Sequence, residues 1–230
     1  MDKKLAFIEH LEELRKRIIK SLIFIAAASC LFYNFIDTIL PGLVKPAGKL
    51  VFIAPHEAFV ARLKIALFGG IFLSLPFVFY QVWKFISSGL TLNERKYALI
   101  FWPLSLLFFF LGAFFGYFIV IPIGIKFLLG FASDVMAPMI TIDSYISFVG
   151  VLTLCFGVIF ELPLIVLFLT QIGLVTPGFL SAKRRHEVVI IFIVASIFTP
   201  PDVISQFLMA LPLLVLYEIS ILLSKFAYHK

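Results

Sequence analysis

Long runs of hydrophobic residues, separated by short polar or charged segments, dominate the chain. The runs cover residues 18–40, 63–86, 97–122, 146–171 and 188–224. A helix needs about 20 apolar residues to cross the roughly 30 Å hydrocarbon core of a bilayer, whereas a membrane barrel shows alternating segments of about ten residues. Because the runs are long and do not alternate, the pattern predicts an all-α integral membrane protein.

The last hydrophobic run is too long for one membrane-spanning helix, and the motif TPPD at 199–202 interrupts it. Proline removes a backbone donor and breaks a helix, so the run should divide into two helices at about 188–199 and 203–224. The chain is then expected to have six transmembrane helices. The first helix of this last hairpin is shorter than a full span, so we expect the hairpin to lie shallow and to thin the bilayer locally.

The composition supports a membrane protein. Of the 230 residues, 62% are hydrophobic and only 14% are charged, and the mean hydropathy is +1.12. Soluble domains have roughly 45–50% apolar and about 25% charged residues. The two cysteines, Cys30 and Cys155, lie singly in apolar runs, without the spacing of a metal site or a disulfide framework.

Lys and Arg residues are distributed unevenly between the two sides that six spans would define. Fourteen lie in the N-terminal segment, the 84–96 loop, the 183–185 loop and the C-terminal tail, against five in the opposite connections. Because positively charged loops stay in the cytoplasm, both termini are expected to be cytoplasmic. The net charge of +6 then reflects this topology and the anionic headgroups, and no nucleic-acid partner is expected.

The N-terminal stretch HLEELRKRIIKS places two acids inside a basic cluster. Its apolar residues recur on one helical face, so residues 5–17 should form an amphipathic helix that continues into the first span. Glu12 with Lys16, and Glu13 with Arg17, are spaced four residues apart in the favourable orientation for ion pairs. These acids could therefore be a salt-bridged helix end or a receptor for a basic partner.

A second acid at a cytoplasmic helix end is Glu94, in the sequence TLNERK. Thr91 and Glu94 have the spacing of a capping box, in which the carboxylate accepts a hydrogen bond from the backbone N–H of Thr91. A pair of carboxylates in a basic surface also suits a planar guanidinium, which bonds to a carboxylate through two parallel hydrogen bonds. A partner bearing arginines is the functional interpretation.

Glu161, in VIFELPLIV, lies in the middle of a predicted span. An ionisable group at that depth is costly unless it is neutral, paired or facing water, so it indicates function, or else a buried hydrogen bond to a neighbouring helix. Pro163 should interrupt the helix just after it. The motif GAFFG, with Gly112 and Gly116, is typical of close helix packing.

Patterns of known enzymes are missing from the sequence. There is no catalytic triad or HExxH-type spacing, and the four histidines fall in different segments. Two rival hypotheses remain: an ion-coupled transporter that uses Glu161 as the carrier carboxylate, and a scaffold whose acids only cap helices.

Four motifs occur in the order HLEELRKR, YQVWKFISSGLTLNERK, FGVIFELP and TPPDVISQ. Together they closely resemble the TatC family, the multispanning core of the twin-arginine protein translocase. The resemblance covers residues 1–230 as a single membrane domain, in which residues 1–17 form a cytoplasmic helix that leads into the first span.

The resemblance implies a concave bundle of six helices in the bacterial cytoplasmic (inner) membrane. It implies a receptor that binds the signal peptides of folded precursor proteins, which carry two consecutive arginines, and that nucleates a translocation complex driven by the proton-motive force. The implied partners are the single-span subunits TatA and possibly TatB, further copies of the chain and membrane lipids. No enzyme activity, cofactor or metal is implied.

The resemblance also implies roles for individual residues. By position in the motifs, the signal-peptide site would comprise Glu13, Glu94, Arg15, Arg17, Phe85 and Leu90. Glu161 matches an intramembrane glutamate that contacts a partner helix. Further family positions, with less defined roles, are Pro46, Tyr117, Asp202 and Gln206.

The chain differs from the family pattern at one point of the site. The family loop commonly reads FIxPGL, whereas this chain has FISSGL, with Ser88 in place of proline. We expect this difference to change the stiffness of the loop and to leave the charged residues of the site unaltered. Glu12 is an additional acid beside Glu13, so which of the two contacts arginine stays open.

Overall fold

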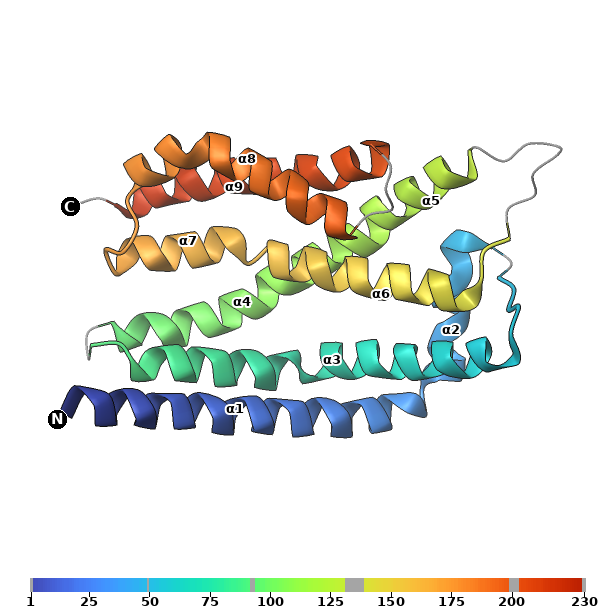
Figure 1. Ribbon diagram of the computed structural model, residues 1–230, viewed down its shortest axis with the longest axis horizontal. Coiled ribbons are helices and arrows are strands. Elements are labelled where there is room, and N and C mark those ends of the chain that lie inside the picture. The colour runs from blue at the N-terminus through green and yellow to red at the C-terminus, as the bar shows by residue number, and fades with distance from the viewer. Residues whose placement is uncertain (1, 49, 92–93, 131–138, 199–202, 229–230) are drawn as a thin grey trace. The chain divides into compact units, whose positions relative to one another are not determined.

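The computed structural model describes residues 2–48, 50–91, 94–130, 139–198 and 203–228. The described residues form helices and no strand, which confirms the all-α prediction (Figure 1). The helices are α1 (Asp2–Tyr33), α2 (Ile36–Val44), the 3₁₀ turn η1 (Lys45–Ala47), α3 (Pro55–Ser88), α4 (Arg95–Phe115), the π-helical stretch η2 (Gly116–Val120), α5 (Ile121–Leu129), α6 (Ile142–Ile159), α7 (Leu162–Gln171), α8 (Pro177–Phe198) and α9 (Val203–Ala227).

The chain divides into two compact units. Unit 1 contains Met1–Lys45, Phe52–Leu106 and Thr141–Ile146. Unit 2 contains Pro46–Val51, Leu107–Ile140 and Ser147–Lys230. Helix α4 begins in unit 1 and ends in unit 2.

Unit 1 is built on α1 and α3, which run side by side in opposite directions (Figure 1). As predicted, the amphipathic N-terminal segment and the first span form one unbroken helix, α1. Gly69 and Gly70 on α3 allow the close approach, because a side chain at Gly70 would overlap the backbone of Ser29 on α1. Small residues permit such contact between helices whose other side chains are large and apolar.

The first helix ends earlier than the hydrophobic run 18–40 indicated. Helix α1 stops at Tyr33, and the chain bends by 85° before it continues into α2 and η1. The Asn34 side chain donates a hydrogen bond to the carbonyl of Leu31 at 3.4 Å, and the N–H of Phe35 turns back to the carbonyl of Phe32. Asparagine competes with helical hydrogen bonding in this way, so a polar side chain ends a helix that hydropathy alone would extend.

Ion pairs and a hydrogen bond join distant segments of unit 1 at the end where α3 begins. Lys64 on α3 pairs with Asp143 at 2.6 Å, and Arg62 pairs with Asp37 of α2 at 2.8 Å. The hydroxyl of Tyr145 donates to the carbonyl of Leu43 at 2.9 Å. These contacts fix α2 and the start of α6 against α3.

In unit 2, close contacts involve the predicted packing motif. A side chain at Gly112 of α4 would overlap the carbonyl oxygen of Phe156 on α6 and the side chain of Phe160, which directly follows α6. The GAFFG motif is therefore a helix contact, as predicted. The expected interruption near Pro163 is also present, because α6 ends at Ile159 and α7 begins at Leu162.

The last two helices form the predicted hairpin, with α8 and α9 lying side by side (Figure 1). Arg184 pairs with Glu218 at 2.8 Å, and the hydroxyl of Tyr217 donates to the carbonyl of Leu180 at 2.9 Å.

One expectation was wrong: the basic cluster at 183–185 lies inside α8, which begins at Pro177, rather than in a loop. A helix tolerates this cluster because long basic side chains carry their charge away from the apolar surface.

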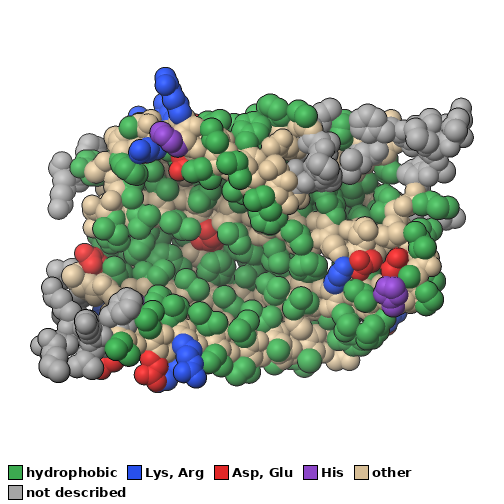
Figure 2. Space-filling view, viewed as in Figure 1, with side chains coloured by type: hydrophobic (Ala, Val, Ile, Leu, Met, Phe, Trp, Pro, Cys, Tyr) green, Lys and Arg blue, Asp and Glu red, His purple; other side chains and the backbone are tan. Residues whose placement is uncertain are grey.

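Four helical stretches in the described part of the chain are long and apolar enough to cross a membrane, and the bent pair of α1 and α2 would make a fifth. Helix α8 is not among them because its first half carries Lys183, Arg184, Arg185 and Glu187. The count of six spans and the cytoplasmic termini stay predictions. Hydrophobic side chains cover most of the face shown in Figure 2. The chain is a multi-pass membrane protein.

Candidate functional site

The first predicted acid, Glu13, joins α1 to α3 through Arg17. The guanidinium of Arg17 donates to Glu13 Oε1 from Nε at 3.0 Å and also from Nη2. Its third nitrogen, Nη1, donates to Gln81 Oε1 on α3 at 3.0 Å. The predicted i, i+4 pair is therefore confirmed, and it forms part of a network that connects two helices. Gln81 is 8% exposed, so the network reaches the packed contact between them.

Residues near the C-terminal end of α3 complete the surroundings of Glu13. The ring of Phe85 stacks on that of His10, with the ring centroids 4.4 Å apart. The second oxygen of Glu13, Oε2, lies 3.9 Å from His10 Nδ1, which is beyond hydrogen-bonding distance. The predicted site residue Phe85 therefore lies near Glu13 through its contact with His10, a residue that the prediction did not include.

The electrostatic surroundings hold Glu13 in its charged form. The hydrogen bond from Arg17 lowers the pKa of the Glu13 carboxyl most strongly, and burial opposes it. Smaller contributions from Ser88 and from the charges of Arg17 and His10 lower this pKa further. The Ser88 hydroxyl donates its hydrogen bond to the carbonyl of Phe85 at 2.7 Å, at the end of α3, where proline would have no side-chain donor.

The neighbouring acid, Glu12, has different surroundings. Its carboxylate pairs with Lys16 at 2.9 Å, and the two side chains are 56% and 66% exposed. The hydrogen bond from Lys16 lowers the pKa of Glu12. An exposed pair of this kind contributes little to stability. Glu12 thus lies on the outer side of α1, while Glu13 faces α3.

Protonating Glu13 should weaken unit 1. Because the folded pKa lies below the ordinary value of 4.5, the stabilisation is present above that pH and is lost as the pH falls through the lower, folded value. Thermal unfolding in detergent should show the native chain more stable than Glu13→Gln at pH 7, by about 1 kcal/mol or less because the site is partly exposed.

The difference between the native chain and Glu13→Gln should disappear below the folded pKa. A difference that stays constant over this pH range would contradict the assigned role of Glu13. Glu12→Gln provides the matched control, because its exposed pair should contribute much less at either pH.

The second predicted acid, Glu94, precedes α4 and forms the expected capping box. Its Oε2 accepts a hydrogen bond from the backbone N–H of Thr91 at 3.0 Å, and the N–H of Arg95 bonds to the carbonyl of Thr91 at 3.1 Å. Glu94 and the nearby Leu90 are both half-buried. Capping occupies one carboxylate oxygen and fixes the direction of the side chain, so it does not exclude a second role.

Unit 1 therefore contains the whole predicted signal-peptide site, from α1, the end of α3 and the start of α4. Of the basic residues, Arg17 is committed to Glu13 and Gln81, whereas Arg15 is exposed. Sequence reasoning missed Gln81. Its only signal was one amide in an otherwise apolar stretch, and nothing in the pattern showed that it faces Arg17.

The remaining predicted residues lie in unit 2. Glu161 directly precedes α7 and is buried, with 6% of its surface exposed. Gln206 holds α9 to α8 by donating to the carbonyl of Phe192 at 3.0 Å. Pro46 lies in η1 and Tyr117 in η2, both half-buried. Asp202 lies outside the described residues.

No group of three potential metal ligands occurs among the residues that the structure describes. The network around Glu13 consists of a carboxylate, a guanidinium and an amide joined by hydrogen bonds. A carboxylate in such a setting can accept charge-assisted hydrogen bonds from a cationic group.

Comparison with known proteins shows which family this sequence resembles. The family model described as Sec-independent protein translocase protein (TatC) matches residues 9–212. The TatC protein of Carboxydothermus hydrogenoformans is 45% identical over 230 residues, which cover 98% of this chain and 95% of the relative. The TatCd protein of Bacillus subtilis is 40% identical, with 100% and 96% of the two chains covered.

A solved structure shares the fold as well as the sequence. The crystal structure of a twin-arginine translocase receptor, TatC, is 38% identical, with a TM-score of 0.87, and the match covers 96% of this chain and 100% of that chain. The chain therefore belongs to the TatC family of Sec-independent protein translocase proteins.

Proposed function

We propose that this protein is the receptor that binds twin-arginine signal peptides of folded precursor proteins. The observation that carries the proposal is Glu13, a carboxylate that is held charged and fixed against α3 in an otherwise basic surface. Its Oε1 already accepts two donors from a guanidinium, that of Arg17. A signal-peptide arginine would bind in the same manner, at Oε2 or by displacing Arg17.

Glu94 supplies the second carboxylate in this proposal. Its Oε2 is engaged by the Thr91 N–H, and Oε1 is the oxygen assigned to the peptide. Hydrogen bonds to charged groups contribute roughly 1.5 to 3 kcal/mol each, less where water competes. Two half-buried carboxylates therefore support moderate affinity for a pair of arginines. The stacked rings of His10 and Phe85 lie beside this site and offer an apolar surface for the peptide.

The wider function follows from membership of a translocase family. We assign the chain to a complex with the single-span subunits TatA and possibly TatB, in the cytoplasmic (inner) membrane, with energy from the proton-motive force. Several copies of the chain would assemble there. The basic ends of α1, α3 and α4 would face the cytoplasm, where precursors are made. Glu161 is assigned to a partner helix, which would reach it only if the cover over this side chain opens.

Export of a folded fluorescent reporter tests this function. Cells whose own copy of the gene is replaced by variants would be given the reporter behind a twin-arginine signal peptide. We expect Glu13→Gln to reduce export at least roughly tenfold, because one charged hydrogen bond is lost. Glu12→Gln is the control and should export normally, since this acid faces away from α3.

The opposite pattern would contradict the proposed site. Full export by Glu13→Gln, at native protein levels, would mean that the network only stabilises the α1–α3 contact. If Glu12→Gln loses export while Glu13→Gln exports normally, Glu12 and not Glu13 is the carboxylate that binds the signal peptide.

A further inference from the structure

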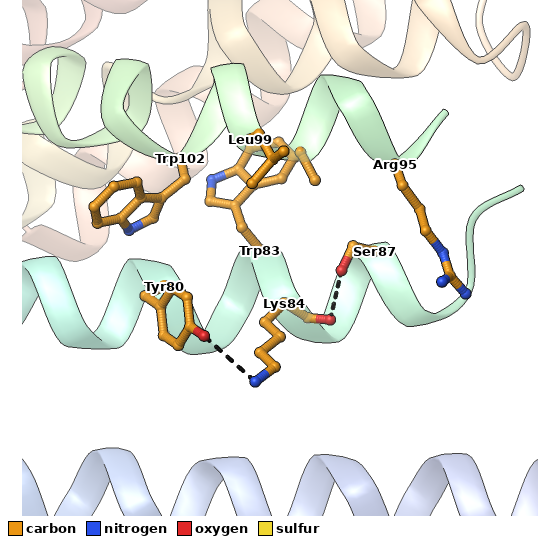
Figure 3. A pocket seen from close by; sticks show the side chains of 8 residues that line it. Tyr80, Trp83, Lys84, Ser87, Arg95, Leu99 and Trp102 are labelled. Atoms are coloured by element: carbon orange, nitrogen blue, oxygen red, sulfur yellow. Dashed lines mark hydrogen bonds between the residues drawn. The ribbon is translucent and has the colours of Figure 1, made fainter. Parts of the chain in front are cut away.

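A cavity in unit 1, separate from the network of Glu13, lies between the end of α3 and the start of α4. Its volume is about 460 Å³, within the range of ligand pockets. Apolar residues form most of its lining (Figure 3). The lining residues are Tyr80, Trp83, Lys84, Ser87, Arg95, Ala98, Leu99 and Trp102.

The aromatic wall presents ring surfaces and no free indole donor. Trp83 Nε1 donates to the hydroxyl of Ser105 at 2.9 Å, and Trp102 Nε1 donates to the carbonyl of Pro76 at 3.2 Å. The ring of Tyr80 meets that of Trp102 edge to face, with the centroids 6.3 Å apart. Because both indole N–H groups are already bonded within the protein, this wall suits a hydrocarbon chain and not a polar headgroup.

Two cations lie on the same cavity. Arg95 extends from the start of α4 toward the end of α3, and Lys84 projects from α3 beside Tyr80 (Figure 3). Lys84 Nζ lies 3.3 Å from the hydroxyl of Tyr80 and 5.4 Å from the centroid of its ring. Within the described part of the chain, neither cation forms an ion pair with a carboxylate. An apolar wall with two available cations fits an amphiphilic anion.

The position of the cavity indicates which amphiphile. On the proposed orientation, the turn between α3 and α4 lies at the cytoplasmic surface, where Trp and Tyr occupy the interface and the leaflet is anionic. Basic pockets between membrane helices on that side bind anionic headgroups. We propose that the cavity binds one anionic phospholipid, with an acyl chain against Trp83, Leu99 and Trp102 and the phosphate at Lys84 and Arg95.

Native mass spectrometry of the purified protein tests this site. The full chain in detergent would be titrated with phosphatidylglycerol or with phosphatidylcholine of the same acyl chains. We expect the first lipid to be retained about ten- to thirtyfold more than the second, as two interfacial cations predict. The variant Lys84→Gln with Arg95→Gln should reduce this preference to about twofold or less, while phosphatidylcholine retention stays unchanged.

Two further variants separate charge from shape. Lys20→Gln with Lys96→Gln removes the same charge from exposed positions that do not line the cavity, and it should keep the preference. Leu99→Trp would place a bulkier side chain on the cavity wall without changing charge. Because Leu99 is 78% exposed, this variant should fold, and it should lose most of the retained lipid of either kind.

Four results would overturn the proposal. Equal retention of the two lipids by the native chain would remove the basis for an anionic ligand. If Lys20→Gln with Lys96→Gln lowers phosphatidylglycerol retention as much as Lys84→Gln with Arg95→Gln does, the preference reflects the net charge of the protein and not this cavity. Undiminished retention in Leu99→Trp would show that the lipid lies elsewhere. Displacement of the retained lipid from the native chain by a hydrophobic helical peptide would assign the cavity to a protein helix.

Discussion

Glu94→Gln should abolish most of the binding of a twin-arginine signal peptide and leave the fold intact. Glutamine retains the oxygen that accepts the hydrogen bond from Thr91, and the capping box accepts Glu or Gln. What the substitution removes is the negative charge. We therefore expect peptide affinity to fall roughly 10- to 100-fold, as the loss of one charged hydrogen bond predicts, with an unchanged unfolding temperature.

This substitution separates the receptor from a scaffold whose acids only cap helices. Titration of a labelled signal peptide in detergent gives the affinity, and circular dichroism during heating gives the stability. Unchanged affinity in Glu94→Gln would restrict Glu94 to capping α4. Glu94→Ala is the companion variant, because it should lose both peptide binding and stability, the latter by about 1 kcal/mol.

Gly70→Ala should cause a large loss of stability in unit 1. A Cβ at this position would lie 2.5 Å from both Cα and N of Ser29, a distance that real side chains do not adopt. The obstacle is backbone, so the helices α1 and α3 must separate to relieve it. Overpacking of this kind costs roughly 1 to 3 kcal/mol, occasionally more. Peptide binding should weaken as well, because the bond from Arg17 to Gln81 spans the same two helices.

Gly42→Ala is the control for the change from glycine to alanine. Gly42 lies inside α2, and a Cβ there would meet nothing within 4 Å. This variant should be unchanged or more stable by up to about 1 kcal/mol, because alanine favours the helix. If both variants unfold at the native temperature, the close contact between α1 and α3 is not required in the way described.

The sequence predicted those features that depend on local pattern. Spacing of four residues was sufficient for the pairs at Glu12 and Glu13, and spacing of three for the cap at Glu94. The unbroken helix through residues 5–17, the interruption before Pro163 and the hairpin of α8 and α9 followed from periodicity and proline.

Features that depend on distant contacts could not be predicted. The hydrophobic run 18–40 continues past Asn34, so hydropathy alone did not predict that the chain bends by 85° after Tyr33. The partner of Arg17 on α3, Gln81, is 64 residues away, and only the packing of two helices brings them together. The start of α8 was placed too late because its basic first half resembles a loop.

The most direct measurement of the central claim compares two peptides on the native protein. One signal peptide carries its pair of arginines, and the other carries two lysines with the same charge. Only guanidinium can offer parallel donors to a carboxylate such as that of Glu13. We predict that the dilysine peptide binds at least about tenfold more weakly. Equal affinity for the two peptides would contradict a receptor that recognises arginine through these carboxylates.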